Sequence, residues 1–133
     1  VCDNAKTLAQ FFATEYSDIE VNYPGLAGSK WHNIATEQFG DKFGGIITIR
    51  TGNKKRAFGI IDALKLPLIV SNIGDTKTLV IHPESTLNVH STQEEKETAG
   101  VFDDLIRISV GIEDIEDLID DFKQAIESVK DVY

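Results

Sequence analysis

The clearest structural signal in the sequence is Leu105-Ile106-Arg107-Ile108-Ser109-Val110, together with the apolar spacing that follows it. Three aliphatic residues alternate there with Arg107 and Ser109, and this period of two is typical of a half-buried β-strand. From Asp114 onward the spacing changes to three and four, which indicates an amphipathic helix. Its inward positions are Ile115, Leu118, Ile119, Phe122, Ile126 and Val129. The sequence therefore predicts a strand over 105–110 that leads into a helix near the C-terminus.

Upstream of this stretch, helical and strand patterns take turns without an internal repeat or a flexible linker. Further helices are expected after a cap at Asp3 or Asn4, after Ser29 (with Trp31, Ile34 and Ala35 buried), over 54–64, and between the capping pair Thr92–Glu95 and Gly100. Strands are expected over 19–23, 46–50 and 78–81, and residues 66–70, which contain Pro67, read as an edge strand or an extended loop. The fold class is therefore α+β, with a mostly antiparallel sheet of about four to five strands and helices on one face.

The composition excludes several classes of protein. The chain has 133 residues, which favours one domain, and its net charge of -9 disfavours nucleic acid or an anionic membrane as a partner. One cysteine cannot form an internal disulfide, so we expect a reducing compartment, the cytoplasm. No apolar run approaches the ~20 residues that span a bilayer, and the histidines are too scattered for a metal site.

The sequence contains no methionine and begins at Val1. Because an initiator residue is missing, we expect the chain to be part of a longer protein.

Several polar groups could carry chemistry but have simpler interpretations. The acidic run over 113–121 is interrupted by apolar residues at helical spacing, so it reads as a solvated helix face. Asp103 and Asp104 lie in a turn-like segment before a strand, and His82 is expected to be a structural hydrogen-bonding residue. Lys77 lies in a polar turn with nothing nearby to desolvate its amine. Cys2 has no partner for catalysis, so no catalytic residue is predicted in this chain.

Arg107 is the strongest candidate for a binding residue. Its guanidinium lies at the centre of a strand, opposite the apolar face, and its five donors suit bidentate capture of a carboxylate. A guanidinium in that position needs either an ion-pair partner in the protein or an anionic ligand. The strand pattern alone leaves both readings open.

A resemblance to a known family bears on this choice. The run from Leu105 to Ile119, the segments 82–86 and 99–101, and upstream the stretch Val21-Asn22-Tyr23-Pro24-Gly25-Leu26 resemble the C-terminal end of the Cys/Met-metabolism family. These are pyridoxal-phosphate enzymes of fold type I: cystathionine synthases and lyases, methionine lyases and sulfhydrylases. The resemblance extends over nearly the whole chain.

Within that family, the segment from Asn72 to Pro83 is similar to the O-acetylhomoserine sulfhydrylases. The resemblance implies that O-acetyl-L-homoserine and sulfide or methanethiol give homocysteine or methionine and acetate, which is a step of cysteine and methionine metabolism. It implies that Arg107 binds the substrate α-carboxylate and that Asn72 helps to hold it, in a position where the family usually has serine. Leu87 and Asn88 depart from the family pattern, which puts any hydroxyl or imidazole contact there in doubt.

The resemblance also identifies what this chain lacks. The family's pyridoxal-phosphate lysine, the aromatic residue that stacks on the cofactor and the aspartate that pairs with its ring nitrogen belong to a large central domain. We therefore interpret residues 1–133 as a single C-terminal domain that is inactive alone and binds no cofactor or metal, from an enzyme that forms a homo-oligomer, a tetramer. The alternatives are the same domain of a cystathionine synthase, a cystathionine lyase or a methionine lyase, or a free-standing ligand-binding or interaction module.

Overall fold

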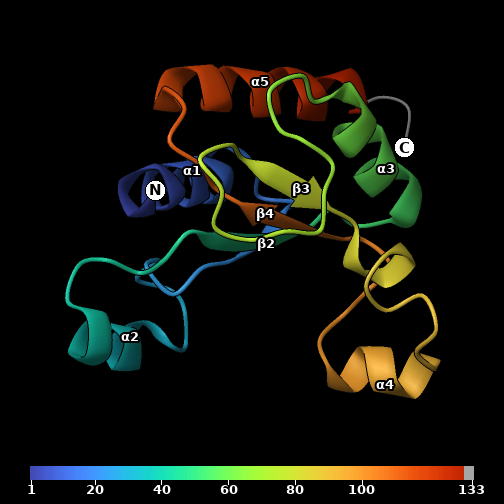
Figure 1. Ribbon diagram of the computed structural model, residues 1–133, viewed down its shortest axis with the longest axis horizontal. Helices are drawn as coiled ribbons and strands as arrows, with labels where there is room; N and C mark the ends of the chain where they lie inside the picture. Colours follow the sequence, from blue (N-terminus) through green and yellow to red (C-terminus); the bar gives the residue numbers. More distant parts are fainter. Residues whose placement is uncertain (131–133) are drawn as a thin grey trace.

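One antiparallel sheet forms the middle of the molecule (Figure 1). The computed structural model describes residues 1–130, so the last three residues of the expected domain lie outside the described part. The strands, in spatial order, are β1 (Glu20–Asn22), β2 (Ile46–Arg50), β4 (Leu105–Ser109) and β3 (Leu79–Ile81), and each pairs antiparallel with its neighbour. The expected α+β class with a mostly antiparallel sheet is confirmed.

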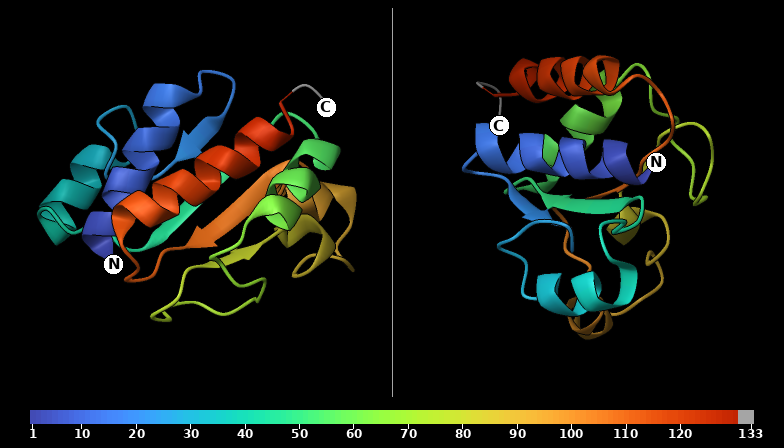
Figure 2. Two further views of the ribbon diagram at one scale, coloured as in Figure 1. Left: turned by 90° about the horizontal axis from the view of Figure 1, so that it is seen from above. Right: turned by 90° about the vertical axis from the view of Figure 1, so that its left-hand side faces the viewer.

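Three long helices form a layer over one face of this sheet. They are α1 (Cys2–Glu15), α3 (Lys54–Ala63) and α5 (Ile115–Ser128), and Figure 2 shows them together on one side. The shorter helices α2 (His32–Phe39) and α4 (Gln93–Thr98) project from the other side, and the 3₁₀ turn η1 (Pro83–Ser85) follows β3. One face of the sheet is therefore covered by helices, and the other is flanked by two projections.

The core lies between the sheet and the three long helices. Strand alternation directs Ile47 and Ile108 into it, and the rings of Phe12 and Phe122 meet edge to face with centroids 5.3 Å apart. The Asp114 side chain caps α5 by accepting from two backbone N–H groups of its first turn. The apolar residues that recur at three- and four-residue spacing in α5, such as Leu118 and Phe122, are the ones that face the core.

Residues 66–70 form the extended loop that the sequence allowed as one of two readings. Only Leu68 makes a bridge there, a parallel one to Leu79, and the ring of Pro67 removes a backbone donor. One expectation on local structure is corrected. The second helix begins at His32, and Trp31 and Ile34, expected to be buried, are each 52% exposed. Ala35 of the same helix is buried, as expected. The helix projects from the side of the sheet that the three long helices leave open, so no helical layer covers Trp31 and Ile34.

Candidate functional site

Arg107 lies at the centre of the sheet on the face that the long helices leave open. It is aligned with Thr48 of β2 on one side and Ile81 of β3 on the other. The flanking residues Ile106 and Ile108 are fully buried against the helices, whereas Arg107 is half-buried. Alternation along β4 therefore places the guanidinium where a ligand could reach it.

The hydrogen-bond partners of the arginines distinguish Arg107 from the other two. The others form ion pairs, Arg50 Nε to Asp104 Oδ1 at 3.1 Å and Arg56 Nη1 to Asp18 Oδ2 at 2.8 Å. Arg107 Nη2 donates only to the backbone carbonyl oxygen of Ser71, at 3.2 Å. Within residues 1–130 no carboxylate oxygen lies within 4.0 Å of its guanidinium nitrogens. Most of its donors are therefore available to an anionic ligand.

Asn72, the second predicted binding residue, lies in the loop that contacts Arg107. It directly follows Ser71, whose carbonyl accepts from the guanidinium, so the structure brings the two predicted residues into one neighbourhood. The Asn72 side chain is exposed, and its Oδ1 accepts from the backbone N–H of Ile73 at 2.9 Å. The amide nitrogen Nδ2 makes no hydrogen bond to another group in residues 1–130 and remains a free donor.

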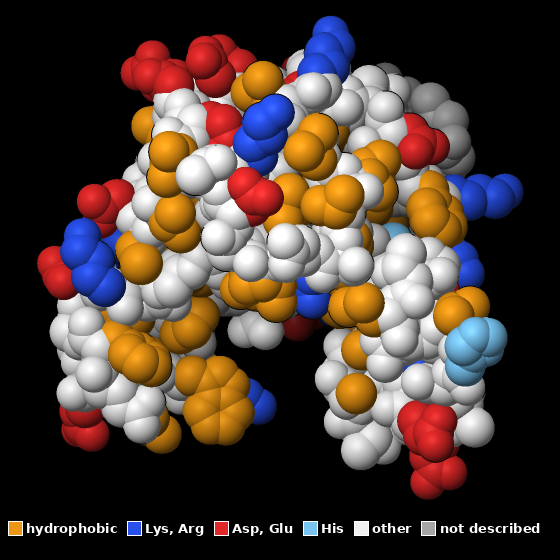
Figure 3. All heavy atoms as spheres, in the orientation of Figure 1, with side chains coloured by type: hydrophobic (Ala, Val, Ile, Leu, Met, Phe, Trp, Pro, Cys, Tyr) orange, Lys and Arg blue, Asp and Glu red, His pale blue; other side chains and the backbone are white. Residues whose placement is uncertain are grey.

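The open face forms the roof of a hollow between the two projections. Figure 3 shows this hollow between the parts of the surface that belong to α2 and α4, with basic side-chain atoms visible at its roof. On the β1 side the structure has a cavity of about 330 Å³ whose lining includes Asn22, Thr48 and Arg50 from the sheet, Trp31 from the start of α2 and Phe102 from the segment before β4. The sheet residues of this cavity lie on the same face as Arg107, because the cross-strand register aligns Asn22, Thr48 and Arg107.

The projection that carries α4 is attached to the body by charge. Glu84 of η1 accepts from Lys96 of α4 at 2.7 Å and from Lys54 of α3 at 3.0 Å. The hydrogen bonds from these two ammonium groups lower the pKa of Glu84 to about 2. One carboxylate therefore links three elements at this wall of the hollow.

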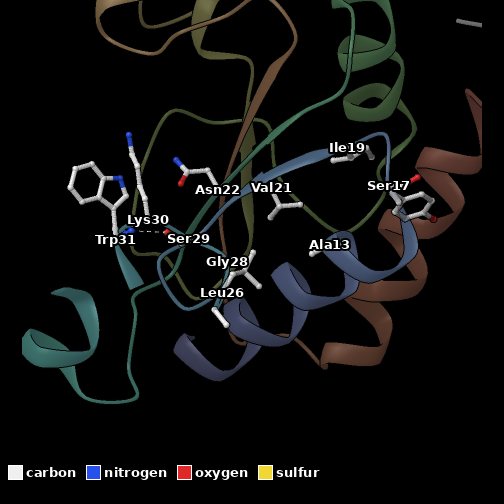
Figure 4. A pocket seen from close by; sticks show the side chains of 12 residues that line it. Ala13, Ser17, Ile19, Val21, Asn22, Leu26, Gly28, Ser29, Lys30 and Trp31 are labelled. Atoms are coloured by element: carbon white, nitrogen blue, oxygen red, sulfur yellow. Dashed lines mark hydrogen bonds between the residues drawn. The ribbon is translucent and has the colours of Figure 1, made fainter. Parts of the chain in front are cut away.

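A second cavity lies at the outer edge of the sheet. It has a volume of about 460 Å³ and is lined by α1, by β1 and by the loop before α2, including Val21, Leu26 and Trp31 (Figure 4). Neither Arg107 nor Asn72 contributes to its lining. They do not line the cavity on the β1 side either, so both predicted binding residues lie outside the two cavities.

The groups read as structural in the sequence have structural contacts. His82 is buried, with Nε2 2.6 Å from the carbonyl oxygen of Asp103 and Nδ1 2.8 Å from Ser85 Oγ. Asp104 is 4% exposed and accepts from the Gly52 backbone N–H at 3.0 Å in addition to its ion pair. Lys77 is exposed. Across residues 1–130, no group of three or more histidine, cysteine, aspartate or glutamate side chains is placed to hold a metal, and no helix is long and apolar enough to cross a membrane.

The acidic run over 113–121 is corrected in part. Glu113 is half-buried and Asp121 is only 7% exposed, although the helical pattern assigns the whole run to solvent. The Asp121 carboxylate accepts from the backbone N–H of Lys65 at 2.9 Å and of Leu66 at 2.8 Å. No sequence signal distinguishes these two acids from their exposed neighbours, because Glu113 binds Thr78 and Asp121 binds the Leu66 backbone, about 35 and 55 residues away.

Comparison with known proteins identifies the class to which this fold and open face belong. Residues 2–127 match the family model described as Cys/Met metabolism PLP-dependent enzyme. The chain belongs to this family, as the resemblance in its sequence implied.

Individual relatives differ in their named activities. An L-methionine gamma-lyase of Fusobacterium nucleatum is 38% identical over 96% of this chain and 32% of its own length. A homocysteine synthase of Schizosaccharomyces pombe is 39% identical over 93% of this chain and 29% of its own length. The chain thus spans about a third of the length of the curated relatives that it matches.

Solved structures agree with the fold. A Campylobacter jejuni chain titled O-acetylhomoserine (thiol)-lyase, which contains a pyridoxyl-lysine phosphate, superposes with a TM-score of 0.89 at 39% identity, over 95% of this chain and 30% of that one. Cystathionine gamma-lyase from yeast superposes with a TM-score of 0.91 at 32% identity, over 97% of this chain and 34% of its own. The homologues are sulfhydrylases and lyases, and the family depends on pyridoxal phosphate.

The described residues do not fit a covalently held pyridoxal phosphate. Eight of the ten lysines in residues 1–130 are exposed, and the two half-buried ones are Lys6, which lies over the Phe43 ring, and Lys96, which pairs with Glu84. No lysine amine is therefore enclosed in a way that would suit the cofactor aldehyde.

Proposed function

We propose that this chain is the C-terminal, substrate-binding domain of a pyridoxal-phosphate-dependent O-acetyl-L-homoserine sulfhydrylase. The whole enzyme would convert O-acetyl-L-homoserine and sulfide or methanethiol into homocysteine or methionine and acetate. The family match over residues 2–127 and the names of two similar proteins, a homocysteine synthase and an O-acetylhomoserine (thiol)-lyase, support this assignment.

The single observation that carries the proposal is that most hydrogen-bond donors of the Arg107 guanidinium have no partner in the described residues. Its guanidinium lies on the accessible face of β4, donates to one carbonyl oxygen and has no carboxylate partner within the described chain. A planar guanidinium binds a carboxylate through two parallel hydrogen bonds, so Arg107 would hold the amino-acid substrate by its α-carboxylate. The free amide nitrogen of Asn72 in the adjoining loop would donate a further hydrogen bond to the same group.

We place the pyridoxal-phosphate site in the part of the enzyme that lies outside this sequence. The chain spans 32% of a relative, and its described lysines do not fit that role. When bound in the whole enzyme, the cofactor supplies the electron sink for the chemistry at the substrate carbon chain. The residues of this chain would bind and orient the amino acid. A cytoplasmic location and a homotetramer stay predictions, for which the single cysteine and the resemblance are the only support.

The proposal on Arg107 is tested in the complete enzyme by steady-state kinetics. Hydrogen bonds to charged groups contribute ~1.5–3 kcal/mol each, so Arg107→Ala should raise the KM for O-acetylhomoserine roughly tenfold to a hundredfold. Arg107→Lys keeps the charge without the planar fork and should recover only part of the affinity. Lys55→Ala, which removes an exposed positive charge on α3, is the matched control and should leave the KM unchanged. An unaltered KM in Arg107→Ala would refute the binding role.

The substrate assignment has a direct competitor. The methionine gamma-lyase relative is as similar as the homocysteine synthase, at 38% and 39% identity. The complete enzyme should release acetate from O-acetylhomoserine when sulfide is supplied. Turnover of L-methionine or cystathionine alone at a higher kcat/KM would assign the chain to a lyase. A natural gene product of only 133 residues would favour a free-standing module instead.

A further inference from the structure

We infer that Glu113 is a positioning residue of the substrate site. Its carboxylate fixes Thr78, which ends the loop over residues 69–77, and this loop carries the Ser71 carbonyl and Asn72 to Arg107. The inference rests on the proposed carboxylate-binding role of Arg107.

The loop has few contacts of its own that could set its conformation. Every residue from 69 to 77 is exposed, and the segment contains no helix or strand. Such a segment is ordered by its attachment points and not by a core. Two of these points lie on the open face of β4, where Arg107 donates to Ser71 O at 3.2 Å and Ser109 Oγ accepts from the Gly74 backbone N–H at 3.2 Å.

The C-terminal end of the loop is held by Glu113 and by the Leu68 backbone N–H, which donates to the Thr78 carbonyl at 3.0 Å. One carboxylate oxygen accepts from the backbone N–H of Thr78 at 2.8 Å, and the other accepts from the Thr78 hydroxyl at 2.9 Å. Thr78 is completely buried, and its hydroxyl oxygen in turn accepts from the Gly111 backbone N–H at 3.0 Å. The ionised carboxylate makes both of its bonds to Thr78 charge-assisted, so this attachment is stronger than a neutral turn contact.

Close backbone approach reinforces the same attachment. The Ile112 backbone N–H donates to the Thr76 carbonyl at 2.9 Å, and a Cβ atom at Gly111 would collide with that carbonyl oxygen. Asn4 of α1 donates through Nδ2 to the Glu113 carbonyl oxygen at 2.7 Å, which also holds the backbone of this residue. The position of Glu113 is therefore determined by α1 and by the turn between β4 and α5.

This arrangement couples Glu113 to Arg107 through the loop. If the Glu113 carboxylate is removed, Thr78 loses two bonds, and the segment that faces the guanidinium gains conformational freedom. Substrate binding must then order the loop, which weakens affinity. The Glu113 carboxylate bonds to Thr78 and not to Arg107 or Asn72, so the chemical step should change little. Loss of Glu113 should therefore act mainly on the KM.

The test uses the complete enzyme and measures KM and kcat separately for O-acetylhomoserine. Glu113→Ala should raise the KM about tenfold, the equivalent of one charge-assisted hydrogen bond, with kcat almost unchanged. Glu113→Gln retains an acceptor oxygen for the Thr78 N–H and should recover most of the affinity. Glu116→Ala removes an exposed acid three positions further along and should behave as the unaltered enzyme.

A double-mutant cycle and hydrogen exchange separate positioning from general stabilisation. Glu113→Ala should add little to the KM of Arg107→Ala, because its effect passes through that residue. Amide exchange over 69–77 should be faster in Glu113→Ala, with α5 unchanged. If Glu113→Ala does not fold, Thr78→Val removes the same hydroxyl contact at constant shape, and Thr78→Ser should restore it.

The possible failures are distinguishable. If Arg107→Ala raises the KM while Glu113→Ala or Thr78→Val matches Glu116→Ala, this inference is wrong and the proposed function stands. Additive effects in the double mutant, or unchanged exchange over 69–77, also overturn it. If Arg107→Ala itself leaves the KM unchanged, the proposed carboxylate site fails first, and the role of Glu113 fails with it.

Discussion

Replacement of Asp121 by alanine should destabilise the protein more than its position on an acidic helix suggests. The side chain lies on α5 but is only 7% exposed, and its carboxylate receives the backbone N–H groups of Lys65 and Leu66 at 2.9 and 2.8 Å. Gln124 Nε2 also donates to it, at 3.0 Å. The carboxylate therefore attaches α5 to the turn that leaves α3.

The magnitude follows from the number and kind of bonds lost. Hydrogen bonds to a charged group contribute ~1.5–3 kcal/mol each, but water can reach the turn in the variant and satisfy part of the freed N–H groups. We expect Asp121→Ala to lower the free energy of unfolding by about 2–3 kcal/mol. Asp121→Asn keeps one acceptor oxygen and should lose roughly half of that amount.

Urea unfolding of the 133-residue chain, followed by far-ultraviolet circular dichroism, measures this difference. Asp120→Ala is the matched control, because it removes an exposed carboxylate at the adjacent position. A surface change of that kind should stay within about 0.5 kcal/mol of the unaltered chain. Equal midpoints and slopes for Asp120→Ala and Asp121→Ala would refute the reasoning.

Two further predictions concern pH. The hydrogen bonds from Lys96 and Lys54 lower the pKa of Glu84 from its ordinary value of 4.5 to about 2. The contribution of this ion pair to stability is therefore complete above pH 4.5 and is lost as the pH falls toward 2. Amide exchange over 93–98 should accelerate in that window, and Glu84→Gln should show fast exchange already at neutral pH. Burial raises the pKa of Tyr23 to about 12, so its stabilising effect is complete below pH 10 and is lost as pH rises through 12. A spectroscopic titration should show one tyrosine that ionises near pH 12 and is missing in Tyr23→Phe.

The candidate site could be predicted in part from one strand. The alternation over 105–110 placed Arg107 opposite the apolar face, and the resemblance assigned it a role. The pattern could not decide between an ion pair and a free guanidinium, because this depends on where Asp18, Asp104 and the other acids lie in space. In the fold, Asp104 pairs with Arg50 and Asp18 pairs with Arg56.

Elements whose signals are local could be predicted from the sequence. Each of these signals depends on neighbours within a few residues, so each can be recognised in the sequence. They are the period of two over β4, the capping pair Thr92–Glu95 and the apolar spacing of α5. The fold was needed to find which acids of the run 113–121 turn inward, because Glu113 and Asp121 bind groups of distant segments. It also decided that Trp31 is exposed, since α2 lies across the sheet from the core. Helical periodicity reports which residues share a face, whereas what that face meets is set by the packing of the whole chain.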